Sequence, residues 1–175
     1  MAVVKKVAIT GPESTGKSTL SRQLAAHYRT EYVPEYAREY VDRLDRHYRQ
    51  EDILVIAKEQ LAMERRAMNQ AETYLFCDTD LIVPKIWELY KYFECHPWII
   101  EQIHWNRYDL ILLCDVDLPW QPDPQREYPN LRQFFFYWFH RELQAYGFPY
   151  RIIRGNEQER LGNAIDAVNS FFNVN

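Results

Sequence analysis

The sequence predicts a three-layer α/β fold, in which helices cover both faces of a mostly parallel sheet. The first observation is that short apolar runs alternate along its 175 residues with longer segments of helical periodicity. This alternation is typical of parallel sheets, because each parallel connection needs a crossover segment, usually a helix. The second is a glycine-rich segment directly after the first apolar run, and the third is the absence of repeats. The length fits one compact domain over residues 1–175.

The N-terminal part of the chain begins the expected sheet. Residues 3–10 are apolar, rich in β-branched side chains, and end at Gly11, which predicts a buried strand. Residues 18–28 place leucine and alanine at helical spacing, and a short strand is expected over 31–33, before Pro34. The first expected strand therefore passes through a glycine-rich turn into the first helix.

The middle of the chain continues the alternation. Apolar residues keep a helical period over 51–68. Residues 74–77 predict the next strand, which is followed by Asp78. Two helices are expected over 81–93 and 98–105, because a His-Pro pair separates them.

The C-terminal third supplies the remaining elements. Residues 109–114 predict a strand, and four prolines within residues 119–129 predict a loop with little regular structure. A helix is expected over 131–146, a strand over 150–153 and a last helix over 157–172. These elements complete the expected three-layer arrangement.

Composition excludes several classes of protein. The net charge of −4 argues against a general nucleic-acid binder, which usually carries a basic face. No apolar run approaches the roughly 18 residues of a membrane span, and lysines interrupt the N-terminus too early for a signal peptide. The three cysteines form no CxxC pair and are expected as buried thiols in the cytoplasm.

The strongest motif is GPESTGKS at residues 11–18, a full match to GxxxxGK[ST] between a strand and a helix. Glycines let the backbone amides and the helix N-terminus surround a phosphate. Lys17 is expected to reach the terminal phosphates and Ser18 to bind Mg²⁺, whereas the alternative is a chance glycine turn. The expected nucleotide-binding residues are Gly11, Glu13, Ser14, Thr15, Gly16, Lys17, Ser18 and Thr19.

A phosphate loop (P-loop) leaves kinases, GTPases, motors and regulatory ATPases open. The guanine-binding NKxD signature is absent. A motor would need a longer chain and a basic or oligomeric working surface, and neither is evident. The small size favours a kinase of a small molecule.

Two acid pairs follow expected strands, Asp78 with Asp80 and Asp115 with Asp117. A carboxylate at such a strand end holds Mg²⁺ in P-loop proteins. Spacing alone does not choose between the pairs. Asp78 is favoured as the metal-side acid, since Asp80 is then free to cap the next helix; the alternative is a capping role for Asp78 itself.

Phosphoryl transfer also needs a group that orients the attacking hydroxyl. On a helix, Glu35, Arg38 and Glu39 would share one face, where a carboxylate could accept a proton or bind ribose hydroxyls. An ordinary exposed salt-bridge set is an equally good interpretation.

The proline-rich segment carries Asp123, Arg126, Glu127 and Arg132. Arginines on a mobile segment can close over a triphosphate and exclude water, which favours a lid. The alternative is a solvated loop whose arginines pair with its own acids.

Aromatic residues form two groups. Four of them follow the acidic strand end and could flank a planar base: Trp87, Tyr90, Tyr92 and Phe93. Residues 134–139 are aromatic all around a helix, which favours packing or dimerisation, and hence a possible homo-oligomer.

Five motifs, in this order, resemble those of the ribosylnicotinamide kinase domain of NadR-type NAD-biosynthesis proteins. They are GPESTGKS at 11–18, EYARE at 35–39, DTD at 78–80, HP at 96–97 and PW…D…R at 119–126. The resemblance covers nearly the whole chain. It implies a P-loop nucleoside-kinase fold with a five-stranded parallel sheet and a lid at about residues 116–132. It also implies ATP-dependent phosphorylation of the 5′-hydroxyl of nicotinamide riboside, giving nicotinamide mononucleotide.

The resemblance carries roles onto individual residues. The expected catalytic residues are Lys17, Glu35, Asp78 and Arg126. The expected substrate-binding residues are Glu35, Arg38, Asp80 and Trp87, and the expected Mg²⁺ ligands are Ser18 and Asp78. The match does not decide whether Glu35 or Asp78 is the base. Two alternatives stay open: a kinase of another nucleoside or vitamin alcohol, and a nucleotide-dependent sensor that transfers no phosphate.

Overall fold

A parallel five-stranded sheet forms the centre of the molecule, with strand order β2-β3-β1-β4-β5. The computed structural model describes residues 3–173, so the first two and last two residues of the predicted domain lie outside the described part. The strands are β1 (Lys5–Thr10), β2 (Tyr32–Val33), β3 (Tyr74–Asp78), β4 (Leu110–Cys114) and β5 (Tyr150–Ile153). The predicted α/β class and parallel sheet are confirmed.

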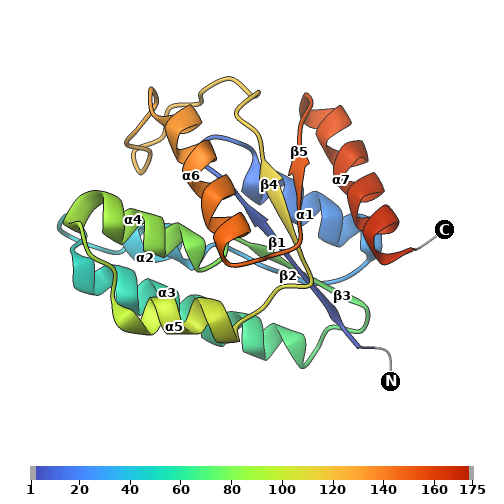
Figure 1. The fold of residues 1–175 in the computed structure, drawn as a ribbon, viewed down its shortest axis with the longest axis horizontal. Coiled ribbons are helices and arrows are strands. Elements are labelled where there is room, and N and C mark those ends of the chain that lie inside the picture. Colours follow the sequence, from blue (N-terminus) through green and yellow to red (C-terminus); the bar gives the residue numbers. More distant parts are fainter. Residues whose placement is uncertain (1–2, 174–175) are drawn as a thin grey trace.

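Helices cover both faces of this sheet (Figure 1). One face packs against α1 (Lys17–Tyr28) and α7 (Glu157–Phe172). The other face packs against α3 (Gln50–Met68), α4 (Ile82–Tyr92), α5 (Pro97–Trp105) and α6 (Arg132–Ala145). A short helix, α2 (Tyr36–Asp42), follows the edge strand β2 and contacts α3.

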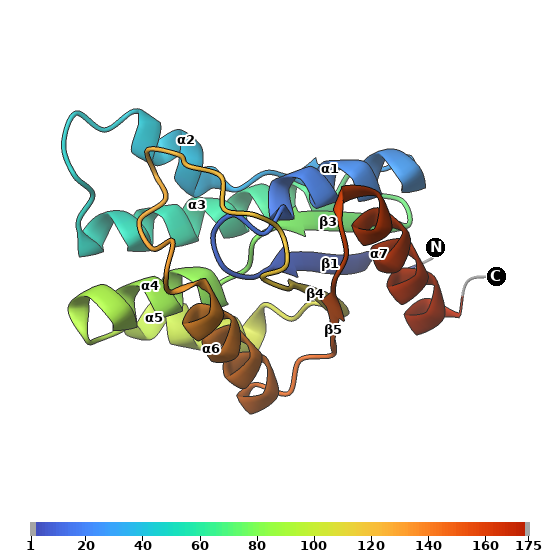
Figure 2. The same ribbon diagram turned by 90° about the horizontal axis from the view of Figure 1, so that it is seen from above.

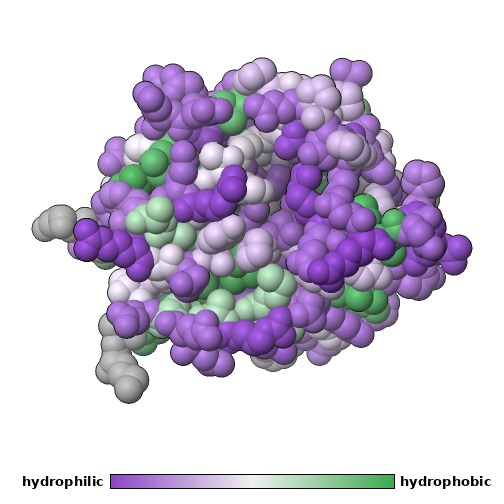
Figure 3. Space-filling view, turned by 180° about the vertical axis from the view of Figure 1, so that it is seen from behind, coloured by the Kyte–Doolittle hydropathy of each residue, from purple (hydrophilic) through white to green (hydrophobic). Residues whose placement is uncertain are grey.

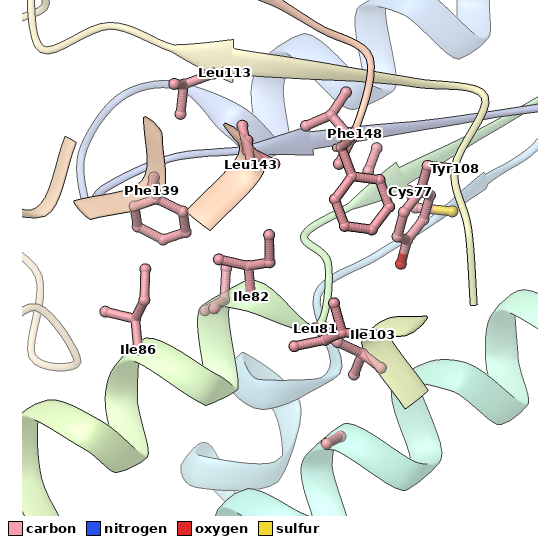
Figure 4. Close-up of a cluster of buried hydrophobic side chains, with 14 of the residues drawn as sticks. Cys77, Leu81, Ile82, Ile86, Ile103, Tyr108, Leu113, Phe139, Leu143 and Phe148 are labelled. Atoms are coloured by element: carbon pink, nitrogen blue, oxygen red, sulfur yellow. The ribbon is translucent and has the colours of Figure 1, made fainter. Parts of the chain in front are cut away.

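The strands bury alternate residues in two separate cores. Val7 and Ile9 of β1 pack with α1 and α7, whereas Ala8 between them belongs to the opposite core. Figure 4 shows part of that second core, where Ile86 of α4 lies opposite Phe139 of α6. Burying one such aliphatic or aromatic side chain stabilises the fold by about 1.5–3 kcal/mol. Because both faces are covered, the strands read as continuous apolar runs.

Two expected elements differ in detail from the structure. The first strand begins at Lys5 instead of Val3, because its pairing with β3 begins at Lys5 and Tyr74. The aromatic run 134–139 is only half buried: Phe135, Phe136 and Phe139 enter the core, as the packing interpretation expects. Phe134 and Tyr137 of the same run are 51% and 61% exposed, so packing accounts for only one side of this helix, and dimerisation through the other side stays a prediction.

Apolar side chains are dispersed on the side of the molecule opposite the view of Figure 1. Figure 3 shows that they form small separate patches there within a mainly hydrophilic surface. Within residues 3–173, no helix is both long and apolar enough to cross a membrane.

Candidate functional site

The loop between β1 and α1 lies at the carboxyl edge of the sheet. Gly11 has a φ of 136°, and a Cβ there would lie 2.9 Å from the Cys114 carbonyl oxygen, so only glycine fits beside β4. Gly16 adopts a left-handed conformation as the N-cap residue of α1. The loop is closed on itself, because Thr15 Oγ1 and Lys17 Nζ donate hydrogen bonds to the Pro12 carbonyl, at 2.8 and 2.7 Å. This geometry leaves the N-terminus of α1 facing a pocket.

A pocket of about 200 Å³ lies above this loop. All eight expected nucleotide-binding residues line it, together with four of the other expected site residues, Glu35, Arg38, Trp87 and Arg126. Tyr128, Gln125 and Arg160 line the pocket as well, although no sequence motif marks them. The fold therefore brings the phosphate loop, the segment after β2, helix α4 and the proline-rich segment to one place.

Asp78 ends β3 directly beside the phosphate-loop strand, since it pairs with Ile9 of β1. Its side chain is buried, and Oδ1 has no hydrogen-bond partner within residues 3–173. Burial raises the pKa of Asp78, while the nearby Ser18 hydroxyl and the Lys17 charge lower it. A carboxylate oxygen left free beside Ser18 suits a hard cation such as Mg²⁺.

The second acid pair, Asp115 and Asp117, forms ion pairs with arginines. Asp115 Oδ2 accepts a hydrogen bond from Arg154 Nε at 2.6 Å, and Asp117 forms an ion pair with Arg160. These contacts join the end of β4 to the segment that leads into α7. Because both acids are paired there, the structure distinguishes the two acid pairs that spacing alone left open.

Asp80 serves a different purpose from Asp78. Its Oδ1 accepts hydrogen bonds from the backbone amides of Ile82 and Val83, at 2.9 and 3.2 Å, and so caps α4. This is the helix-capping role that the sequence allowed. Asp80 is absent from the lining of the 200 Å³ pocket, and its expected contact with substrate stays a prediction.

Glu35 precedes α2 and is half-buried at the pocket wall. Burial raises the pKa of Glu35, the Asp78 carboxylate raises it further, and the Lys17 and Arg38 charges oppose this. Glu39 does not join this group, because it pairs with Arg43 on the exposed surface. Of the two interpretations left open for Glu35, Arg38 and Glu39, the exposed ion pair therefore applies to Glu39, whereas Glu35 and Arg38 line the pocket.

The proline-rich segment, residues 116–131, passes over the phosphate loop (Figure 2). Arg132 Nη1 donates to the carbonyl oxygens of Ser14 and Leu118, at 3.1 and 2.9 Å. On the other side, Arg38 forms an ion pair of 2.9 Å with Asp123. Glu127 also pairs with a cation outside the segment, Lys91, at 2.6 Å. Asp123 and Glu127 thus do not pair with the arginines of their own segment, as the alternative interpretation supposed.

Comparison with known proteins identifies the family. A family model described as an AAA domain matches residues 6–160, from β1 to the first turn of α7. The chain belongs to this AAA domain family. The trifunctional NAD biosynthesis/regulator protein NadR of Salmonella typhimurium (strain LT2) is 33% identical over 130 residues, which is 70% of this chain. The chain spans 31% of the length of that curated relative.

Solved structures extend this likeness to nearly the whole chain. A crystal structure of NadR protein in complex with NR superposes with a TM-score of 0.85 at 26% identity, over 99% of this chain and 53% of that chain. Thymidylate kinase from Ehrlichia chaffeensis shares the fold alone, with a TM-score of 0.62 at 11% identity over 97% of this chain and 99% of that chain. The expected NadR-like character and the nucleoside-kinase-like fold are confirmed.

The aromatic residues of this AAA domain divide differently from the expectation. Trp87 lines the pocket, and the ring of Tyr48 stacks on the Trp87 ring, with centroids 6.0 Å apart. Phe93 is 89% exposed at the end of α4, and Tyr90 packs edge-on against Tyr128, so neither lines the pocket. Helical spacing alone does not show that only one side of α4 faces the pocket.

Magnesium would have few protein ligands in this domain. No group of three acidic, histidine or cysteine side chains suited to a metal exists within residues 3–173. Mg²⁺ usually keeps several waters and binds through one or two protein oxygens plus phosphates. Ser18 and the unpartnered oxygen of Asp78 meet that requirement.

Proposed function

We propose that the protein is an ATP-dependent kinase that phosphorylates the 5′-hydroxyl of nicotinamide riboside, giving nicotinamide mononucleotide. The observation that carries the proposal is that Glu35 and Lys17 line the same pocket, beneath a segment bearing Arg126. A phosphate-binding group, a carboxylate and a cation are thus available to one reaction. The complex of the similar NadR protein with NR supports a ribosylated pyridine as the acceptor.

The donor end of the pocket is proposed to hold the triphosphate. The backbone amides of the phosphate loop and the N-terminus of α1 would bind its oxygens, and Lys17 would exchange its contact with Pro12 for the terminal phosphate. Ser18 and Asp78 would hold Mg²⁺, and the ion would supply charge that stabilises the transferring phosphoryl group. Arg126 adds positive charge on the lid side.

The acceptor end is proposed to lie between Glu35 and Trp87. A carboxylate whose pKa is raised by burial is a better proton acceptor than an exposed one, so Glu35 is the proposed base. Trp87 offers a flat face to the base of the nucleoside, backed by Tyr48. Arg38 pairs with Asp123 of the proposed lid, so its position at the acceptor end would depend on whether the lid is docked.

The direct test is an acceptor panel with labelled ATP and, in parallel, labelled GTP. Nicotinamide riboside, other nucleosides and vitamin alcohols are compared for phosphorylated product. We expect nicotinamide riboside to be phosphorylated with the highest kcat/KM, with ATP as donor. Faster transfer to another acceptor would replace the substrate, and acceptor-independent hydrolysis without any transfer would favour the sensor.

A further inference from the structure

One buried side chain holds the backbone on both sides of Glu35. Gln60, in the middle of α3, is 3% exposed. Its Oε1 accepts a hydrogen bond from the Tyr36 amide at 2.9 Å, and its Nε2 donates to the Pro34 carbonyl oxygen at 3.2 Å. A single amide group therefore spans the two peptide units that flank Glu35.

These contacts replace the usual cap of α2. Glu35 occupies the N-cap position, but its side chain makes no capping hydrogen bond. The amide of the first helical residue has no partner within its own helix, so a capping group normally satisfies it. Gln60 satisfies the Tyr36 amide from another helix, and the carboxylate of Glu35 is left available to the pocket.

The strand before Glu35 gives this segment only a short pairing with the sheet. The preceding strand, β2, has two residues at the edge of the sheet. Ile56 and Ala57 lie on α3 one turn before Gln60 and are apolar. Burying an amide among apolar groups costs free energy unless its hydrogen bonds are made. The two bonds to the backbone around Glu35 account for a polar residue at this position.

We infer that Gln60 is a positioning residue, which fixes Glu35 at the acceptor end of the pocket. The inference rests on the proposed function, because it takes Glu35 as the group that orients the acceptor hydroxyl. Displacing such a group by about 1 Å can lower a rate 10²-fold. Gln60 is absent from the lining of the 200 Å³ pocket and lines, with Glu35, only a smaller cavity of about 20 Å³ beside it. Both of its hydrogen bonds go to the backbone around Glu35, so it acts through Glu35.

Two substitutions separate positioning from general stability. Gln60→Met keeps the length of the side chain and removes both hydrogen bonds. Gln60→Glu keeps an acceptor for the Tyr36 amide and loses the donor to Pro34.

With the best acceptor of the panel, we expect kcat to fall at least tenfold in Gln60→Met and less in Gln60→Glu. The KM for ATP should stay within twofold. The control is the same substitution at an exposed glutamine, Gln70→Met, in the turn that follows α3, and it should behave as wild type.

Hydrogen–deuterium exchange gives a second readout that needs no acceptor. In Gln60→Met, exchange should speed up in residues 34–40 and stay unchanged in residues 11–18. Unchanged exchange at 34–40, or transfer within twofold of wild type, overturns the inference. A parallel loss of kcat, ATP affinity and melting temperature also overturns it, because that pattern indicates a purely structural residue. Failure of the proposed function shows separately, as absence of transfer by the wild-type protein.

Discussion

The carboxylate of Glu13 accepts a hydrogen bond from the backbone amide of Tyr128, over a distance of 3.2 Å. The Glu127 amide donates to the same carboxylate at 3.1 Å. Glu13 occupies a variable position of the phosphate-loop motif, whereas Glu127 and Tyr128 lie in the proline-rich segment proposed as the lid. The residue thus joins the two segments that would enclose the triphosphate.

Loss of this contact should loosen the lid. Hydrogen bonds to a charged acceptor contribute about 1.5–3 kcal/mol, so Glu13→Ala should weaken docking of residues 116–131 substantially. We expect the ratio of ATP hydrolysis to phosphoryl transfer to rise severalfold, because water then reaches the donor. The ratio is measured from labelled phosphate and labelled product in one assay. Glu13→Gln, which keeps an acceptor oxygen, should have a smaller effect, and equal ratios in all three proteins would contradict the role.

Arg126 should affect transfer more than binding. It lines the pocket from the lid, where it donates to the Gln121 carbonyl oxygen. Arginines that stabilise a transferring phosphoryl group contribute about 10³–10⁵ in rate in related chemistry. Arg126→Ala is expected to lower kcat at least tenfold and to leave the Kd for ATP within threefold, by calorimetry. Arg66→Ala, on the exposed side of α3, is the control. A large loss of ATP affinity in Arg126→Ala would argue against a role of Arg126 in transfer.

Lys17 should be indispensable for turnover. Its ammonium group lies at the phosphate loop, 2.7 Å from the Pro12 carbonyl oxygen. Lys17→Ala removes the charge nearest to the expected terminal phosphates, so turnover should fall below 1% of wild type, on the order of a 10²-fold loss or more. Steady-state assays with saturating ATP check this. Lys58→Ala, at an exposed position of α3, is the control. Retained turnover in Lys17→Ala would refute the assignment.

Glu35 should set the acidic side of the pH profile. Burial raises its pKa above the ordinary value of 4.5, so kcat/KM for the acceptor should fall with decreasing pH at a higher pH than for an exposed glutamate. Glu35→Gln should lower kcat strongly and abolish this limb. An unchanged limb in that variant would assign it to another group.

The same shift has a consequence for stability. Since the folded state favours protonated Glu35, its contribution to the free energy of unfolding is greatest below the unfolded pKa. That contribution is lost as the pH rises through the raised folded pKa. Glu35→Gln should therefore be at least as stable as wild type near pH 8. Urea denaturation at pH 5 and pH 8 measures both proteins, and a less stable variant at pH 8 would contradict the argument.

Asp80 should matter for stability through its cap. Replacing an N-terminal capping residue by alanine costs about 0.5–2 kcal/mol, whereas asparagine caps about as well as aspartate. Asp80→Ala should thus lower the free energy of unfolding by about 1–2 kcal/mol, and Asp80→Asn by much less. Urea denaturation of the two variants provides the measurement. Equal losses would show that capping of α4 is not what Asp80 contributes.

The predictable part of the candidate site is the part built from neighbouring residues. GPESTGKS lies between a strand and a helix, and its loop geometry follows from local glycine conformations and the start of α1. The strands were equally predictable, because burial on both faces leaves apolar runs. The start of β1 was missed, since it depends on where β3 begins.

The places of the acidic and aromatic side chains could not be predicted in the same way, because they depend on contacts between distant segments. Asp78 and Asp115 both follow an apolar strand, so the sequence does not distinguish them. In the structure Arg154, 39 residues after Asp115, donates a hydrogen bond to the Asp115 carboxylate. Glu39 and Phe93 lay within plausible motifs, and the packing of α2 and α4 turns both to the surface. Tyr128 carried no signal, because its place at the pocket depends on how the lid folds back.

Local sequence patterns were therefore sufficient to define the α/β class and the phosphate loop, and the order of five motifs carried the resemblance to NadR-type kinase domains. The backbone conformations and strand burial that they need are encoded within a few residues. The difference between the two acid pairs, the docking of the proline-rich segment and the position of Glu35 depend on hydrogen bonds and ion pairs between elements far apart in sequence, such as Arg38 with Asp123 and Gln60 with Tyr36. Only the assembled sheet and its helices bring those partners within bonding distance.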